Sequence, residues 1–530
     1  MPPRLHQSSP FSLLVGPLVL SVCGLAMLVG CGQTADPQPE QEAKTTQQST
    51  RSIKTAELNQ EANKRDLGNR STPTGPIQTQ RANDDPAFRT EEPQERMLGA
   101  LLKQSQSDDA FIPAPIDETQ VRTLGIRKVS GRYIDLYTDV RDDVVDEYVQ
   151  AFDLAVPQWS AYFDVAVPEP DEFHVRGSLM QDKDRFRTAK LLPVDSPPFP
   201  HGYQDGAEIW VYPKPGDYFT RHLILHEGTH AFMRRVLHGA GPPWYMEGIA
   251  ELLATHRWHD GQLQLGYTLK SNDEAPYWGR LGIVQAAFEE GRSPSLEAIL
   301  QYGWRAHLQT EPYGWSWAAC AFFDGHPLYR PVFRQLRDNV TDQTITFSQK
   351  FIDALPGNWN QVTEQWQLFI AEMDFGYDLE RTAISYRPTH LPEQAESIAV
   401  RADRGWQSSG LRLEAGTTYR IQATGDVILA PSPKPWRSEA NGITIHYYKG
   451  KPLGILLGAI RDQNSRLEGL TPLATPFVIG QDLEIRPDSS GTLFLRINDS
   501  PTDLANNRGE FDVLVTPIPS SSVDVNASPR

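Results

Sequence analysis

Two short motifs constrain the fold of this chain more than any other feature of its sequence. The first reads His226-Glu227-Gly228-Thr229-His230, and Glu247 follows its last residue by seventeen positions. Residues four apart on a helix lie on one face, so His226 and His230 can direct both imidazoles to one point. Zinc in a catalytic site takes three protein ligands of the histidine and carboxylate type and keeps a fourth position open, so Glu247 is the candidate third ligand. The sequence therefore predicts two adjacent helices that share one zinc ion.

The residues around these motifs carry the signals expected of helices. Three apolar residues at 223–225 give the first segment the apolar weight of a buried helix. The glycine and two prolines at 241–243 end that helix and begin the next. Glu251 lies four residues after Glu247 on the same helix face, where its carboxylate can accept a ring N–H from a metal-bound histidine and fix the tautomer. Glu227, beside the first histidine, is the candidate general base.

The pair of motifs resembles the gluzincin branch of the peptidase MA superfamily, in which His-Glu-x-x-His is followed by a helix reading Trp-x-x-Glu-Gly-x-Ala. The matching positions in this chain are His226, Glu227, His230, Trp244, Glu247, Gly248 and Ala250. The resemblance implies a peptidase that acts on a peptide or protein substrate, with Zn²⁺ on His226, His230 and Glu247 and with Glu227 as catalytic base. Two alternatives stay open: a buried helix whose histidines are only hydrogen-bonded, and a peptidase fold that has lost its activity.

Tyr313 opens a later segment with helical pattern, Tyr-Gly-Trp-Ser-Trp-Ala. In gluzincin peptidases a tyrosine or histidine from a later helix stabilises the oxyanion of the tetrahedral intermediate. Tyr313 resembles that catalytic element by its order along the chain. The alternative is a core tyrosine with a bonded hydroxyl group.

The N-terminal residues carry an export signal. Arg4 precedes an uncharged, mostly apolar stretch over 11–30, which ends in Leu28-Val29-Gly30-Cys31. Residues 1–31 therefore resemble the lipoprotein signal peptide of bacteria, with its lipobox, which implies lipidation of Cys31 and a lipid anchor. The expected location is the cell envelope, at the outer membrane or cell surface; the alternative is an uncleaved helix that spans the bilayer. Residues 32–119 are poor in aromatics and favour a disordered linker, with a short helix near 97–102.

The charge of the chain excludes some classes of partner. Its formal net charge is −17, and no basic cluster is visible. Nucleic acids and anionic membrane surfaces both select basic patches, so we expect no nucleic-acid partner.

Residues 120–387 predict an α+β, zincin-like metallopeptidase domain. We expect strands at 128–137, 172–175 and 207–212, and a helix over 145–163 that is interrupted or kinked at Pro157. Further helices are expected at 293–300, 313–323, 331–338, 348–355 and 358–373. The resemblance also implies that a strand edge beside the active-site helix holds an extended peptide by β-augmentation.

The pattern changes after a linker at 387–395. Residues 396–518 read as short alternating strands punctuated by Gly, Pro, Asn and Asp, which predicts an all-β sandwich, and 519–530 a disordered tail. The chain as a whole is thus expected to be multidomain.

One loop of this predicted sandwich, 498–511, is rich in oxygen ligands. It resembles the loop of the calcium-dependent, galactose-binding bacterial lectin fold, Asn-Asp-x-Pro followed after four residues by Asn-Asn-x-Gly, which implies Ca²⁺ and a carbohydrate partner. The ligands implied are the side chains of Asp499, Asn506 and Asn507 and the backbone oxygens of Asp503 and Leu429. The sugar-contacting loop of that family is not recognisable around 431–441, and an Asx-rich turn without metal is the alternative.

Two functional hypotheses follow. The first is an envelope-anchored zinc metallopeptidase with an accessory sandwich. The second is a non-catalytic surface lipoprotein that binds carbohydrate through the C-terminal domain. Metal analysis separates them.

Overall fold

The computed structural model describes residues 95–99, 113, 115–141, 143–462, 465–467 and 469–519, all within the unit Pro76–Arg530. The predicted signal peptide, its Cys31 and most of the C-terminal tail lie outside the described residues. In the described part, no helix combines the length and apolarity needed to cross a bilayer.

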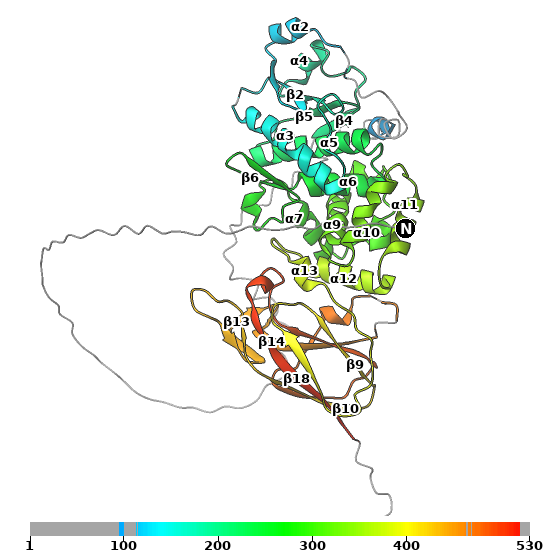
Figure 1. Ribbon diagram of the computed structural model, residues 1–530, viewed down its shortest axis with the longest axis vertical. Coiled ribbons are helices and arrows are strands. Elements are labelled where there is room, and N and C mark those ends of the chain that lie inside the picture. Colours follow the sequence, from blue (N-terminus) through cyan, green and yellow to red (C-terminus); the bar gives the residue numbers. More distant parts are fainter. Residues whose placement is uncertain are drawn as a thin grey trace, which may run out of the picture. The chain divides into compact units, whose positions relative to one another are not determined.

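The first described region is a mixed α/β arrangement built on a five-stranded sheet (Figure 1). Its strand order is β1-β2-β3-β5-β4, with β2, β3 and β5 parallel and with β1 and β4 as antiparallel edges. The strands are β1 (Arg127–Ser130), β2 (Ile134–Thr138), β3 (Val175–Leu179), β4 (Gly202–Asp205) and β5 (Glu208–Val211). The helices in this region are α2 (Glu118–Thr123), α3 (Val144–Phe163) and α4 (Lys183–Thr188).

The single strand expected at 128–137 is wrong, because the chain turns back within it as the β1–β2 hairpin. The Asp153 carboxylate on α3 accepts hydrogen bonds from the backbone N–H groups of Arg132 and Tyr133 at 2.7 and 2.8 Å. A Cβ at Gly131 would lie 2.7 Å from Asp153 Oδ2, so only glycine allows this close approach. The turn thus depends on a helix residue about twenty positions later.

Other strand and helix predictions differ in detail. The strand expected at 172–175 begins only at Val175, β4 was not predicted, and α3 runs unbroken through Pro157.

Two long helices carry the predicted metal motifs. They are α5 (Asp217–Val236) and α6 (Pro243–Ala254), and α6 begins with Pro243 at its first position, as the sequence indicates. Both motif glycines are sites of close packing. A Cβ at Gly228 would lie 2.5 Å from the Phe152 ring on α3, and one at Gly248 would lie 2.4 Å from Cys320 Sγ on α9 (Glu311–Gly325). These contacts fix α5 against α3 and α6 against α9.

The remaining helices follow α6. The chain first forms a hairpin of β6 (His256–His259) and β7 (Gln262–Leu265). The helices are α7 (Arg280–Glu289), α8 (Leu296–Ile299), α10 (Arg330–Gln335), α11 (Ile345–Ala354), α12 (Trp359–Glu372) and α13 (Leu379–Thr382). The sequence predicts each of these except α7 and α13. Aromatic residues from α3, α5, α6, α9, α11 and α12 share one continuous hydrophobic core.

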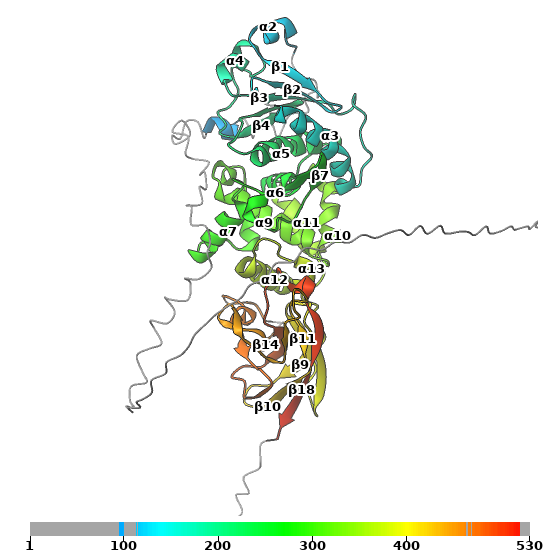
Figure 2. The ribbon, with the colours of Figure 1, turned by 90° about the vertical axis from the view of Figure 1, so that its left-hand side faces the viewer.

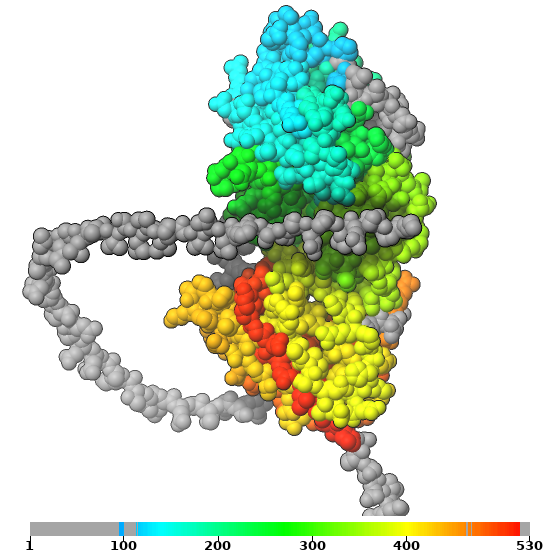
Figure 3. All heavy atoms as spheres, viewed as in Figure 1, coloured from blue at the N-terminus to red at the C-terminus, as the bar shows by residue number. Residues whose placement is uncertain are grey.

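The C-terminal region consists of β-sheets, which is consistent with the predicted sandwich. One sheet has the order β12-β11-β18-β10-β16 with β8 paired to β18, and the other has the order β13-β14-β17-β9 with β15 paired to β14. Its longer strands are β8 (Glu396–Arg401), β9 (Gln407–Leu413), β10 (Thr418–Thr424), β13 (Asn441–Tyr448), β14 (Lys451–Arg461), β16 (Asp482–Ile485), β17 (Gly491–Ile497) and β18 (Arg508–Ile518). Its short strands are β11 (Val427–Ile428), β12 (Arg437–Ser438) and β15 (Phe477–Val478). Figure 3 shows β18, in red, crossing the sandwich surface between the yellow strands and the orange β13–β14 hairpin.

Candidate metal centre and adjoining cavity

Three side-chain atoms from α5 and α6 converge on one point. The Nε2 atoms of His226 and His230 are 3.1 Å apart, and Oε2 of Glu247 lies 3.2 and 3.3 Å from them. All three residues are buried, with exposures of 5–6%. The structure therefore brings together the three residues that the sequence singles out, and their donor atoms form a nearly equilateral triangle.

The donor set fits a small tetrahedral cation. Zinc–nitrogen and zinc–oxygen bonds of about 2.0–2.1 Å place neighbouring ligands of a tetrahedron roughly 3.3–3.4 Å apart, close to the separations seen here. Buried Glu247 Oε2 makes no hydrogen bond with any described residue. Two imidazoles that face each other through Nε2 also need a proton or a cation between them. These residues could hold a metal ion, and the structure does not identify which metal.

The charges around the triangle favour a cation. Burial opposes ionisation of Glu247, but His230 and His226 hold the pKa of its carboxyl group well below the usual value. Burial lowers the pKa of His230. At His226 the same burial is outweighed by Glu247 and Glu251, which raise the pKa to about 9. Glu247 therefore faces the two imidazoles as a carboxylate at pH 7, which favours a cation at the triangle.

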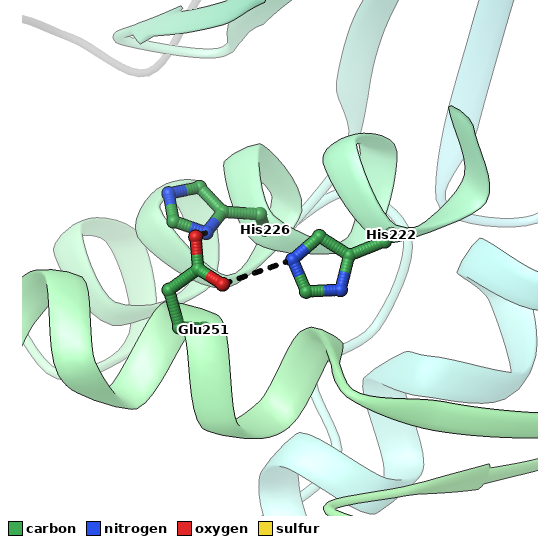
Figure 4. A group of neighbouring side chains, drawn as sticks. All are labelled: His222, His226 and Glu251. Carbon is green, nitrogen blue, oxygen red and sulfur yellow. Dashed lines mark hydrogen bonds and ion pairs between the residues drawn. The ribbon is translucent and has the colours of Figure 1, made fainter. Parts of the chain in front are cut away.

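Glu251 lies one turn after Glu247, with its carboxylate between His222 and His226 (Figure 4). Its Oε1 is 3.6 Å from His226 Nδ1, a nitrogen without a hydrogen-bond partner among the described residues. Its Oε2 is 3.2 Å from His222 Nε2, and Arg280 on α7 donates to Oε1 at 2.8 Å. Glu251 is therefore placed beside His226, one of the candidate ligands, as the helix spacing predicts.

His222 lies one turn before His226 on α5 and is not among the metal ligands that the sequence predicts. His222, His226 and Glu251 nevertheless form a second group close enough to share an ion. One contact argues against a second cation there: the Arg280 guanidinium donates a hydrogen bond to Oε1 of Glu251, the oxygen that lies beside His226 Nδ1. We interpret this group as a network that holds Glu251 in place.

The side chain of Glu227, on α5, lies against the edge strand β4. A Cβ at Gly202 would lie 2.4 Å from Glu227 Oε1, so a glycine is needed where β4 meets this carboxylate. Burial raises the pKa of Glu227 to about 8. Sequence reasoning did not identify Gly202, because only the β4–β5 hairpin brings it to the site.

A cavity of about 110 Å³ opens beside the triangle. It is lined by His226 and Glu227, by Arg280 and Tyr313, and by His307, which the sequence analysis also missed. Tyr313 lies near the start of α9, with its ring centroid 6.4 Å from that of His226 and 5.0 Å from that of His307. Burial raises the pKa of Tyr313 well above its usual value, so its hydroxyl group keeps its proton. Its catalytic role stays a prediction.

The Asx-rich loop of the C-terminal region forms a second, looser cluster of oxygens. Asn507 donates through Nδ2 to Oδ2 of buried Asp499 at 2.8 Å, and Asp499 has its pKa raised to about 6 by burial. The Oδ1 atoms of Asn506 and Asn507 are buried and make no hydrogen bond with described residues. Leu429 directly follows Ile428, which pairs with Arg508, so its backbone lies opposite Asn507.

The Asp503 carbonyl oxygen already accepts the Asn506 N–H at 3.1 Å. The structure thus places Asp499, Asn506 and Asn507 together in one loop, with the backbone of Leu429 opposite Asn507.

Comparison with known proteins adds little to this geometry. No family model matches the chain, and no curated protein matches it. Among solved structures, the N-terminal domain of EclA, a PllA-like lectin, is similar to 24% of this chain over 96% of its own length, with 20% identity and a TM-score of 0.17. At this TM-score the likeness carries no argument about function.

Proposed function

We propose that this protein is a zinc-dependent peptidase. The observation that supports it most strongly is the triangle of His226 Nε2, His230 Nε2 and Glu247 Oε2, with sides of 3.1–3.3 Å. Glu227 and a cavity lie directly beside this triangle. A helix whose histidines serve only as buried hydrogen-bonding groups would not need two Nε2 atoms and a carboxylate oxygen aimed at one point.

The chain's own residues supply the rest of the reaction. When bound, zinc would polarise the scissile carbonyl group and lower the pKa of a water molecule. Glu227 in its ionised form, which a bound zinc ion would favour against burial, accepts the proton of the attacking water and delivers it to the leaving amine. The protonated Tyr313 hydroxyl group donates to the developing oxyanion. Glu251 orients the His226 ring through its Nδ1 side.

The edge strand β4 is the candidate binding surface for an extended substrate. It is the last strand at one edge of the described sheet, and its first residue, Gly202, lies against Glu227. A peptide that adds to this edge by backbone hydrogen bonds would run past the general base.

Replacing Glu227 tests this proposal. We expect Glu227→Gln to retain about one zinc per chain and to lower kcat by about 10²–10⁴-fold, the usual contribution of general acid–base catalysis. Glu289→Gln makes the same change at an exposed position and serves as the control. Hydrolysis by purified Glu227→Gln at the wild-type rate would refute the assignment.

A second candidate function belongs to the C-terminal region. The two buried, unpartnered amide oxygens of Asn506 and Asn507 beside the Asp499 carboxylate suit a calcium ion, and carbohydrate would then be the ligand class. Calcium-dependent retention on a galactose column, with no zinc and no peptide hydrolysis, would favour this function over the first.

We also propose that the protein is exported and lipid-anchored through Cys31, on the sequence of residues 1–31 alone. Metabolic labelling with a radiolabelled fatty acid, lost in Cys31→Ser, tests this proposal.

A further inference from the structure

A short stretch before the mixed α/β region lies against the cavity beside the metal triangle. Residues 95–99 are helical, and Met97 lines the same cavity as His226 and Glu227. Leu98 is 7% exposed, and Met97 packs against the hydrophobic cluster that contains Tyr203 of β4. Both ribbon views show this blue helix beside β4 (Figures 1 and 2). The Met97 side chain therefore forms part of one wall of the proposed substrate site.

An ion pair holds the same stretch at a second point. Glu95 accepts two hydrogen bonds from the Arg305 guanidinium, at 2.9 and 3.4 Å. Arg305 lies two residues before His307, which lines the cavity. Glu95 and Met97 are also two residues apart. The acidic side chain therefore contacts Arg305 and the apolar side chain contacts the cavity at neighbouring points.

Apolar and neutral groups form part of the cavity lining, together with the charged side chains of Glu251 and Arg280. Phe219, Leu223 and Ile283 contribute apolar surface to its lining. Burial lowers the pKa of His201 to about 3 and that of His307 to about 4, so both lining imidazoles are neutral at pH 7. A volume of about 110 Å³ is small beside the roughly 300–1,000 Å³ of pockets that hold drug-sized ligands, and it suits a single side chain.

We propose that this cavity is a side-chain subsite for peptides that carry an apolar residue two positions after an acidic residue, and that residues 95–99, whose Met97 forms part of the cavity wall, compete with such peptides from within the chain. Arg305 reads the acidic residue, and the cavity takes the apolar one. The inference rests on the proposed peptidase function, since it names the substrate class of that site. An internal segment competes at high effective concentration, so a peptide in solution must displace Met97 before it binds.

Peptide binding to full-length Glu227→Gln tests the competition without requiring turnover. The probe is a fluorescent, amide-capped peptide of residues 95–99, Glu-Arg-Met-Leu-Gly, followed by anisotropy in the presence of zinc. We expect Met97→Asp in this background to bind the probe at least tenfold more tightly, because the internal segment no longer fits. Arg96→Asp places the same new residue at the exposed neighbouring position and should change nothing. Equal affinities of the Met97→Asp and Arg96→Asp chains would overturn the proposal.

A charge exchange tests the role of Arg305. In the Met97→Asp chain we expect Arg305→Glu to weaken binding of the probe several-fold. The same substitution should strengthen, by a similar factor, the binding of a second probe that has arginine in place of the glutamate. A uniform effect on both probes would show that Arg305 does not read the acidic residue. Because all measurements are of binding, they can succeed even where the wild-type chain shows no peptide hydrolysis, which would instead refute the proposed reaction.

Discussion

The metal triangle of α5 and α6 and the Asx-rich loop at 498–511 are both predicted from motifs, but the structure organises them differently. In the triangle, two helices that are fixed against their neighbours bring three donor atoms within 3.3 Å of one another. In the loop, Asp499 and Asn507 are already hydrogen-bonded to each other, while two amide oxygens lack described partners. The helical motif therefore supports a far more specific chemical conclusion than the loop motif.

This difference follows from the periodicity of the two backbones. Helical spacing alone places His226 and His230 on one face, so only the approach of α6 remains to be set by packing. The ligands in the loop depend on turn geometry and on Leu429, which directly follows β11 and lies far away in sequence. The first site should thus resist perturbation of the second.

Loss of a triangle ligand should have the largest effect. Glu247→Gln removes the carboxylate charge but keeps the size of the side chain. We expect zinc affinity to fall by more than about 100-fold, the upper range for groups that only support a ligand, and peptide hydrolysis to fall with it. Asp499→Asn is the matched change in the loop and should leave zinc content unchanged by elemental analysis. Equal zinc loss in both variants would show that the two regions are not independent.

The glycine that sets the approach of α6 should be nearly as sensitive. Gly248→Ala places a methyl group 2.4 Å from Cys320 Sγ and 2.5 Å from the Ser316 carbonyl oxygen, so α6 and α9 must separate. Overpacking of this kind costs about 1–3 kcal/mol of unfolding free energy. Gly282→Ala in α7 is the control, because no described atom lies within 4 Å of its added Cβ, and helix propensity predicts about 0.5–1 kcal/mol of stabilisation. Denaturant titration measures both, and a stabilised Gly248→Ala would contradict the close packing.

The sequence predicts the triangle because helix spacing pairs its two histidines and a second short motif supplies Glu247. It misses the groups that only tertiary packing brings to the site. Arg280 lies twenty-nine residues after Glu251 on a helix with no recognised motif, and Gly202 belongs to an unpredicted edge strand. The turn at Gly131 depends on Asp153 from another element. His307 could have been found from the sequence, because the family resemblance leads us to expect a tyrosine or histidine donor in this region and His307 precedes Tyr313 by six residues.

Arg280 supports the triangle indirectly and should have an intermediate effect. Arg280→Met keeps the bulk of the side chain but removes the hydrogen bond to Glu251 Oε1. We expect zinc affinity to fall by about 10–100-fold, the usual cost of losing a group that orients a ligand, with the fold retained by circular dichroism. Arg292→Met, at an exposed arginine close to the end of α7, is the control. Unchanged affinity in Arg280→Met would mean that His222 alone positions Glu251.

Calcium should act only in the loop. If the Asp499 carboxylate and the two unpartnered amide oxygens bind Ca²⁺, free Ca²⁺ at 100 times its dissociation constant should stabilise the folded chain by about 2.7 kcal/mol. Differential scanning calorimetry would detect this stabilisation as a rise in Tm. Asp499→Asn removes the negative charge and should abolish the rise, whereas Glu227→Gln should preserve it. An equal rise in the wild-type and Asp499→Asn chains would place the calcium elsewhere and leave the loop as an Asx turn whose amide oxygens bind no ion. The triangle would then be the one motif of the two whose geometry supports a metal ion.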